Sequence, residues 1–280
     1  MGTAHVRPGA SSTIPGVYDY LLGGKNNLPP DREAAEALAA KAPEAFAAVR
    51  WNRFFSVRAV RFCVGAGVDQ FVDVGSGFPT SPNVHEVARK VHPDARVVYV
   101  DKDPLVATHD RALNAVGKTA IVEADLRDPD AVIADPEMGL IDWTRPVGVL
   151  FVAILHFLDD HDAMRAVTGF REAMSPGSYL VVSHASPGSR KDIDEAVKTY
   201  RDHVADIWPR TPEQIAPYVT GLELVEPGLV PVQRWRPDLA DPSVQINTAR
   251  GLPQLADDAP GAEFVAGVAR VPEPGGAADG

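Results

Sequence analysis

The order of strand, glycine turn, helix and strand in residues 70–103 constrains the fold more than any other part of the chain. Residues 71–74 form a short apolar, β-branched run that stops at a glycine turn, residues 75–77. Apolar side chains then recur at helical spacing, and a second apolar run, residues 96–100, follows. This order predicts one βαβ unit of a parallel sheet, in which ligands bind at the carboxyl ends of the strands.

The charge around the turn indicates which ligand binds there. Gly75, Ser76 and Gly77 are not followed by the third glycine of a dinucleotide fingerprint, and Asp73 stands just before them. That carboxylate would repel a diphosphate, but it suits S-adenosylmethionine, which carries an ammonium and a sulfonium. Asp101 ends the second strand, where an acid accepts hydrogen bonds from ribose hydroxyls.

Composition narrows the class of protein and of partner. The formal net charge of −11 disfavours nucleic acid and anionic membranes, which bind clustered Lys and Arg. The single cysteine, Cys63, excludes an internal disulfide and fits a reducing compartment. Residues 1–12 lack an apolar signal core, and no apolar run approaches the length of a membrane span. We therefore expect a cytoplasmic protein with a small or neutral substrate.

Residues 1–64 are predicted to form an arm and helices that pack on the core. Tyr18 and Tyr20 lie in a dense run of large side chains, which the flexible turn 23–27 follows. This segment could fold over a ligand as a lid, or it could be an arm packed on the core. We expect a loose tail before it, in residues 1–13.

Two helices should follow the arm. Asp31 is predicted to cap an alanine-rich helix that ends near Lys41, and Pro43 to begin a longer one that ends near Val64. Arg53 shares the apolar face of the longer helix. A guanidinium there needs an anion, which could be a structural carboxylate or the carboxylate of a ligand.

Residues 119–124 are predicted to form the third strand, which leads to Asp125 and Leu126. Asp125 could accept a hydrogen bond from the exocyclic amine of an adenine, with Leu126 beside the ring. It could instead cap the next turn, as aspartate often does. Within residues 80–91, Ser81 is the predicted cap of the helix and Pro82 its first residue.

Two histidines follow the next strands. His156 comes at the end of the buried run 147–155, and His184 ends the run 179–183. Each could act as a general base, line a ligand pocket, or be a hydrogen-bonded core residue. The acids among residues 159–162 resemble metal ligands, but acids also favour a helix start, so we expect no metal site.

The region after residue 188 is predicted to insert helices, up to about residue 220, into a domain that spans residues 65–271. Thr211 begins a capping-box sequence. Two late runs, residues 222–225 and 264–269, should form an antiparallel pair at the sheet edge. We place Trp235 in the long loop between them and expect residues 272–280 to be disordered.

Several blocks of the sequence together resemble the actinobacterial S-adenosyl methyltransferase family, long described as a domain of unknown function. The resemblance covers nearly everything from Ile14 to Pro237. It rests on residues 18–27 (YDYLLGGKNN), 73–86 (DVGSGFPTSPNVHE), 100–104 (VDKDP), 124–129 (ADLRDP), 155–157 (LHF), 177–180 (GSYL) and 224–228 (LVEPG).

The resemblance implies the α/β fold of a class I methyltransferase: a doubly wound, Rossmann-like, mostly parallel seven-stranded sheet with an N-terminal helical extension. It favours the lid interpretation of the segment through Tyr20 and Lys25, and it implies that Arg53, next to Asn52, grips the methionine carboxylate. Pro79 stands where many methyltransferases have glycine. The resemblance implies that members of this family have the same proline.

We therefore expect methyl transfer from S-adenosylmethionine to a small-molecule acceptor by in-line displacement. Candidates near the acceptor are His156, His184, Tyr18 and Tyr20. Candidates for cofactor binding, some of them from the resemblance alone, are Asp73, Gly75, Ser76, Gly77, Asp101, Lys102, Asp125, Leu126, Ala153, Arg53 and Lys25. Two alternatives are a regulatory protein that binds S-adenosylmethionine or S-adenosylhomocysteine without catalysis and an NAD-dependent oxidoreductase. The sequence predicts neither the acceptor nor the oligomeric state.

Overall fold

Eight strands form one sheet in the computed structural model, which describes residues 12–113, 116–187, 193–244 and 263–274. Their order across the sheet is β3-β2-β1-β4-β5-β8-β6, and β7 also pairs with β8. The strands are β1 (Gln70–Val74), β2 (Arg96–Asp101), β3 (Thr119–Glu123), β4 (Gly148–Val152), β5 (Tyr179–Ser186), β6 (Glu223–Leu224), β7 (Val230–Pro231) and β8 (Glu263–Arg270).

The first five strands run parallel to their neighbours, and β8 runs antiparallel to β5, β6 and β7. The predicted α/β sheet, mostly parallel and closed by antiparallel strands, is thus confirmed. β7 adds a two-residue strand to the seven that we expected. The expectations for residues 1–11 and 275–280 lie outside the described residues.

Helices cover both faces and one end of the sheet. They are α1 (Ile14–Leu21), α2 (Pro29–Lys41), α3 (Ala45–Gly65), α4 (Val84–Arg89), α5 (Pro104–Leu113), α6 (Pro129–Ile133), α7 (Asp160–Ala173), α8 (Ile193–His203) and α9 (Pro212–Ile215), with short 3-10 turns η1 (Pro136–Leu140), η2 (Leu155–Phe157), η3 (Ala216–Val219), η4 (Val232–Arg234) and η5 (Pro237–Leu239). Within the described ranges, no helix combines the length and the apolar character needed to cross a membrane.

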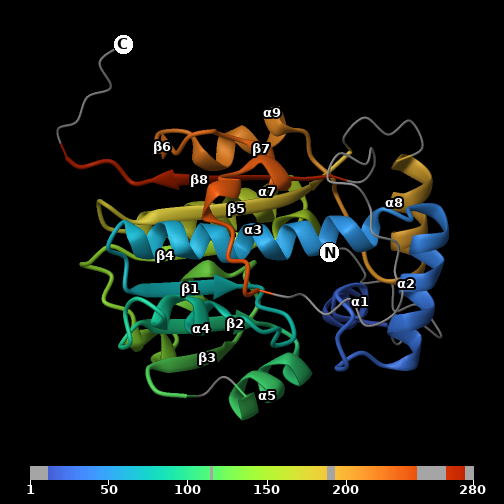
Figure 1. The fold of residues 1–280 in the computed structure, drawn as a ribbon, viewed down its shortest axis with the longest axis horizontal. Coiled ribbons are helices and arrows are strands. Elements are labelled where there is room, and N and C mark those ends of the chain that lie inside the picture. The colour runs from blue at the N-terminus through green and yellow to red at the C-terminus, as the bar shows by residue number, and fades with distance from the viewer. Residues whose placement is uncertain (1–11, 114–115, 188–192, 245–262, 275–280) are drawn as a thin grey trace.

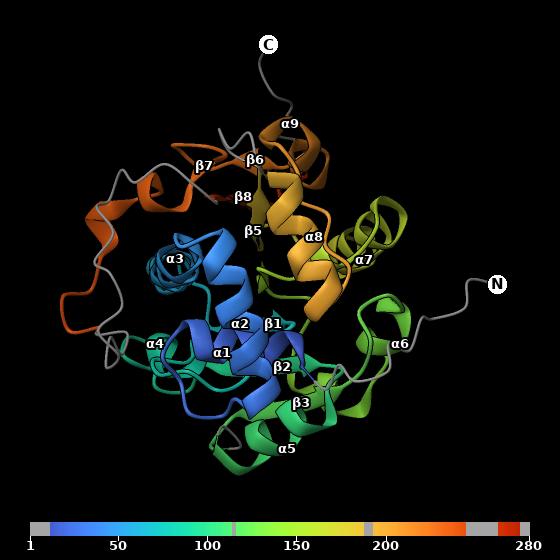
Figure 2. The same cartoon turned by 90° about the vertical axis from the view of Figure 1, so that its right-hand side faces the viewer.

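The strands feed two apolar cores, one on each face of the sheet. Successive side chains of a strand point to opposite faces, so Phe71 joins the core under α3 while Val72 joins the core under α7. Figure 1 shows the long α3 crossing one face, with α1, α2 and α8 gathered at one end of the sheet. Figure 2, seen from that end, shows α3 and α4 on one side of the sheet and α6 and α7 on the other.

Two predicted helix starts are wrong, because each helix begins at a residue other than the one that follows the predicted cap. α4 begins after Asn83, whose backbone N–H donates to Glu86 Oε2 at 2.5 Å, so Ser81 is not the cap. α2 begins at Pro29, and Asp31 lies inside the first turn, where its carboxylate accepts from the N–H of Leu28 at 2.7 Å. Proline at the first helical position accounts for the earlier start.

Trp235 lies in the connection between β7 and β8, as predicted, and its side chain belongs to the core. Its side chain is fully buried, and its ring packs edge-on against Phe55 and Phe62 of α3 at centroid distances of 5.4 and 5.8 Å. Arg58, also buried on α3, donates to the carbonyls of Trp235 and Val232. Residues 232–235 therefore close over the outer face of α3.

Candidate active site

Two neighbouring cavities lie at the carboxyl ends of the parallel strands, under α1 and the segment that follows α8. The larger has a volume of about 390 Å³ and the smaller about 110 Å³. Tyr18 of α1 and Phe157 of η2 line both, so these two side chains form the boundary between the cavities. Predicted site residues that line the larger cavity are Asp73, Gly75, Ser76, Gly77, Asp101, Lys102, Leu126, Ala153, Arg53 and Tyr18.

The glycine turn after β1 forms the floor of the larger cavity. Gly75 and Gly77 have φ angles of 73° and 63°, which favour glycine. A Cβ on Gly75 would lie 2.4 Å from Ile154 Cγ1, whereas a Cβ on Gly77 would meet nothing within 4 Å. Close packing thus requires glycine at the first position, and the second leaves open space for a ligand. The N–H of Gly77 donates to Asp101 Oδ2 at 2.9 Å.

Asp73 presents an unpartnered carboxylate to the larger cavity. It is only 8% exposed, and among the described residues it makes neither a hydrogen bond nor an ion pair. Burial raises the pKa of Asp73 to about 6, although the nearby charge of Arg53 opposes that rise. A cationic ligand would supply the missing partner of the ionised form.

Asp101 is held by backbone donors on both sides. Its two carboxylate oxygens accept from the N–H groups of Gly77 and Asp103, each at 2.9 Å. Each oxygen has a second lone pair, so the carboxylate can still accept hydrogen bonds from a ligand. Burial raises the pKa of Asp101 above its ordinary value, and the two backbone N–H groups counteract this rise.

Arg53 finds backbone carbonyls rather than the structural carboxylate that we considered. Its Nη2 donates to the carbonyls of Thr80 and of Pro82, the latter at 2.7 Å. Within the described part of the chain it forms no ion pair, and its Nε is buried without a hydrogen bond. Asn52 Oδ1 is likewise buried and unpaired. Two orphaned polar atoms thus occur at neighbouring residues of α3, of which Arg53 lines the larger cavity.

Of the three N-terminal candidates, only Tyr18 reaches the cavities. Its hydroxyl accepts from Asn52 Nδ2 at 2.9 Å, and burial raises its pKa. Tyr20 lies two residues further along α1, hence on the other side of the helix, where its hydroxyl donates to Glu36 Oε1 at 2.8 Å. Lys25 is exposed and lines neither cavity.

The turn after α1 is built around Asp19. Its carboxylate accepts from the N–H of Asn26 at 2.9 Å and from Asn27 Nδ2 at 2.7 Å. A Cβ on Gly24 would lie 2.1 Å from Asp19 Oδ1, which explains the glycine. α1 packs against α2 and α3 and also lines both cavities, so one segment packs on the core and borders the cavities.

The third strand delivers Leu126, but not Asp125, to the larger cavity. Asp125 pairs with Arg127, at 3.0 Å from Nε to Oδ2, and with Lys102 at 3.6 Å. Burial alone would raise the pKa of Asp125, but the hydrogen bonds from Arg127 and the charge of Lys102 lower it to about 2. The carboxylate is therefore engaged by neighbouring cations.

The two histidines have different surroundings. His156 lines the smaller cavity, and its Nδ1 accepts from the N–H of Ala185 at 3.3 Å. The proton of the neutral ring is therefore on Nε2. Burial lowers the pKa of His156 well below its usual range. His184 lines neither cavity. Its Nδ1 donates to the carbonyl of Ala185 at 2.8 Å, and its Nε2 accepts from Arg210 at 2.9 Å. It has the contacts of a core histidine.

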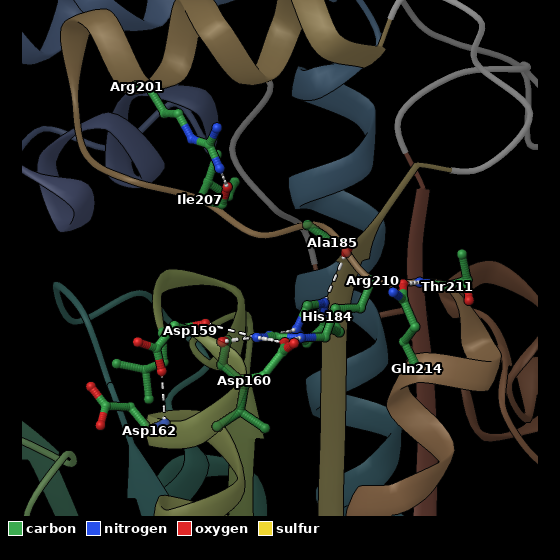
Figure 3. A network of polar contacts seen from close by, with 12 residues as sticks. Asp159, Asp160, Asp162, His184, Ala185, Arg201, Ile207, Arg210, Thr211 and Gln214 are labelled. Atoms are coloured by element: carbon green, nitrogen blue, oxygen red, sulfur yellow. Dashed lines mark hydrogen bonds and ion pairs between the residues drawn. The ribbon is translucent and has the colours of Figure 1, made fainter.

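Arg210 is the residue at this site that sequence reasoning missed. Figure 3 shows its guanidinium between Asp160 and His184. It donates to Asp160 Oδ1 at 2.8 Å and to the carbonyls of Leu155 and Leu158 at 3.1 and 2.9 Å. These bonds fix the loop that carries His156 and Phe157. Sequence gave no signal for this role, because every partner is distant along the chain.

The acids after β4 stabilise a helix. Asp159 caps α7 and accepts from the N–H of Asp162 at 2.9 Å. Asp160 pairs with Arg210, and the described residues contain no cluster of three or more potential metal ligands.

Ala153 follows β4 beside the larger cavity in a left-handed conformation, with a φ of 57°. Its N–H donates to the carbonyl of Ser183 at 3.1 Å. A side chain costs free energy in this conformation, and such strain often occurs at functional sites.

Comparison with known proteins identifies relatives over almost the whole chain. Residues 9–272 match the model of a family described as S-adenosyl methyltransferase. A crystal structure from Thermobifida fusca YX, named as a candidate methyltransferase, is 39% identical, with 94% of this chain and 96% of that chain covered and a TM-score of 0.83. A DUF574 family protein from Streptomyces avermitilis MA-4680 is 38% identical, with 93% and 98% covered and a TM-score of 0.82. No curated protein matches.

Proposed function

We propose that this chain, which belongs to the S-adenosyl methyltransferase family and is an S-adenosylmethionine-dependent methyltransferase, methylates a small molecule. The acceptor binds beside the larger cavity. The observation that carries the proposal is that the larger cavity, of about 390 Å³ and with the buried, unpartnered carboxylate of Asp73, adjoins a second cavity of about 110 Å³. Ligand cavities of this size are typical for small molecules. The carboxylate attracts a cationic ligand and disfavours a diphosphate.

The residues of the larger cavity fit S-adenosylmethionine. Asp73 would face its positive charge, and Asp101 would accept from the ribose hydroxyls with its remaining lone pairs. Leu126 would pack against the adenine. Arg53, which lines this cavity and forms no ion pair with the described residues, would donate to the methionine carboxylate.

S-adenosylmethionine supplies an electrophilic methyl group, which leaves sulfur without its bonding electrons as the lone pair of the acceptor forms the new bond. The protein holds the nucleophile in line, at the boundary that Tyr18 and Phe157 form. An O–H or N–H acceptor also releases a proton, which passes to water. His156 does not take that proton, because its Nδ1 is occupied and its Nε2 carries a hydrogen.

We also propose that the protein works in the cytoplasm and binds neither nucleic acid nor membranes. The net charge of −11 and the single cysteine support this.

Calorimetric titration of the purified protein with S-adenosylmethionine, S-adenosylhomocysteine and NADH tests the ligand assignment. We expect both sulfur ligands to bind and NADH not to bind. The Asp101→Asn variant should bind them about 10-fold to 100-fold more weakly, since it loses hydrogen bonds to a charged acceptor. Asp130→Asn, an exposed change on α6, is the matched control. Binding of NADH alone would overturn the assignment.

A second experiment tests the size of the acceptor. The protein is incubated with methyl-labelled S-adenosylmethionine and a cell extract that has been separated into small-molecule and macromolecular fractions. We expect label in the small-molecule fraction. Label confined to protein or nucleic acid would contradict the proposal.

A further inference from the structure

The smaller cavity shares α1 and the segment after α8 with the larger one, but α2, α8 and the strands β5 and β8 line the smaller cavity alone. Its walls come from α1, α2 with the adjoining Ala42, α3, η2, α8, the ends of β5 and β8, and residues 207 and 209, and they are almost entirely apolar. Figure 1 shows α1, α2 and α8 together at this end of the sheet. Its volume of about 110 Å³ is below the roughly 150 Å³ of an engineered cavity that binds benzene. The part of an occupant that is buried in this cavity is therefore no larger than one aromatic ring.

No charged side chain lines this cavity among the residues that the structure describes. His156, its one titratable residue near neutral pH, stays neutral because burial lowers its pKa. A charged group that entered would lose its hydration and find no ionic partner, which costs several kcal/mol. An occupant must therefore be uncharged in its buried part.

Aromatic rings form one side of the cavity. The Phe157 and Tyr200 rings stack at 5.9 Å and 25°, and His156 lies 4.2 Å from Phe157. Phe264 closes the group, with its ring 5.7 Å from that of His156. Such walls favour offset-stacked or edge-on contacts with another ring.

Two polar groups in these apolar walls lack partners. Tyr200 is only 9% exposed, and its hydroxyl makes no hydrogen bond to any described residue. Burial raises the pKa of Tyr200, so the hydroxyl keeps its proton and can donate. Ser186, 4% exposed, likewise has no side-chain hydrogen bond within the described part of the chain. Buried polar groups without partners are uncommon, and a ligand can satisfy them.

Residues 205–209 connect the two cavities. Ala205, Asp206 and Trp208 line the larger cavity, whereas Ile207 and Pro209 line the smaller one. The N–H of Trp208 donates to the carbonyl of His156 at 2.8 Å, which fixes this segment next to η2. Together with Tyr18 and Phe157, it places the smaller cavity directly beside the proposed methyl donor site.

We propose that the smaller cavity is the acceptor subsite and that the acceptor is an uncharged molecule with one ring-sized apolar part and a hydroxyl or amine group. This rests on the proposed function. The ring lies against Phe157, Tyr200 and Phe264, a polar atom of the acceptor pairs with the Tyr200 hydroxyl, and the nucleophilic atom lies at the Tyr18 boundary. Charged metabolites of the same size are excluded.

Binding to the protein without S-adenosylmethionine tests this proposal directly. Saturation-transfer NMR at pH 7.5 compares p-cresol, which is neutral, with 4-methylbenzoate, which has a similar shape and a negative charge. We expect p-cresol to bind at least 10-fold more tightly than 4-methylbenzoate. Affinities that agree within twofold would overturn the exclusion of charge.

Two variants locate the binding. Ala42→Leu fills the smaller cavity and should weaken p-cresol binding at least 10-fold, whereas Ala40→Leu, on the exposed side of α2, should leave it unchanged. Tyr200→Phe keeps the ring and removes the unpaired hydroxyl, so it should weaken p-cresol binding several-fold and leave toluene binding unchanged. Equal effects of the two alanine variants, or no effect of Tyr200→Phe, would overturn the assignment.

Titration with S-adenosylmethionine separates this proposal from the proposed function. Ala42 does not line the larger cavity, so Ala42→Leu should bind S-adenosylmethionine as the wild type does. Loss of p-cresol binding with intact S-adenosylmethionine binding supports the subsite. Failure of S-adenosylmethionine to bind the wild type would instead contradict the proposed function.

Discussion

The ionised carboxylate of Asp73 should lower the free energy of unfolding of the ligand-free protein. The carboxylate is buried without a partner, and burial raises its pKa from an ordinary value of 3.8 to about 6. A raised pKa means that the folded state holds the proton more tightly than the unfolded state. The stability that this group contributes is therefore present below pH 4 and is lost as the pH rises through about 6. At higher pH the cost reaches about 3 kcal/mol, at 1.36 kcal/mol per pKa unit.

The Asp73→Asn variant removes this cost while nearly preserving the shape of the side chain. Above pH 7 its free energy of unfolding should exceed that of the wild type by up to about 3 kcal/mol. The difference should disappear near pH 4, where the wild-type carboxyl is protonated. The variant should also bind S-adenosylmethionine about 10-fold to 100-fold more weakly, because the charged partner is lost.

Urea denaturation of both proteins between pH 4 and pH 8 measures the difference, in which other titrating groups cancel. Asp130→Asn, an exposed change on α6, serves as the control and should show no such pH dependence. A variant that is less stable than the wild type at pH 8, or a difference that does not vary with pH, would refute the reasoning.

Three further predictions concern stability. Arg210→Lys should lower the free energy of unfolding by about 3 kcal/mol in urea denaturation, since lysine cannot satisfy Asp160, His184 and two carbonyls together. A loss below 1 kcal/mol would contradict the role of Arg210 in fixing the loop that carries His156. Ala153→Gly should raise the melting temperature by relieving about 1 kcal/mol of strain at a φ of 57°, and an unchanged or lower value would argue against that strain. Trp235→Ala should cost about 3 to 5 kcal/mol because the ring is fully buried against Phe55 and Phe62; a cost near zero would show that α3 does not need this cover.

Local patterns predicted much of the fold and many of the residues that line the larger cavity. The βαβ unit is visible because apolar runs, a glycine turn and a helical repeat follow one another within residues 70–103. Asp73 and Asp101 end neighbouring parallel strands, so topology alone brings them together. The predicted capping box that begins at Thr211 is also confirmed, and it could be predicted because all its contacts are local.

The remaining features depend on contacts between distant segments. The partners of Arg210 lie in β5 and the loop after β4, and those of Arg53 are carbonyls of the loop before α4. Asn83 competed successfully with Ser81 for the cap of α4, and either sequence is a good cap in isolation. The smaller cavity combines residues from α1, α2, α3, α8 and β5, so no single stretch of sequence reveals it.

A crystal structure with S-adenosylhomocysteine is the most direct test of the two-cavity account. We predict that the ligand occupies the larger cavity, with its ammonium near Asp73, its ribose on Asp101 and its sulfur facing the boundary between Tyr18 and Phe157. The smaller cavity should stay free for an acceptor. A sulfur that faces away from that boundary, or a ligand that fills the smaller cavity, would contradict the account.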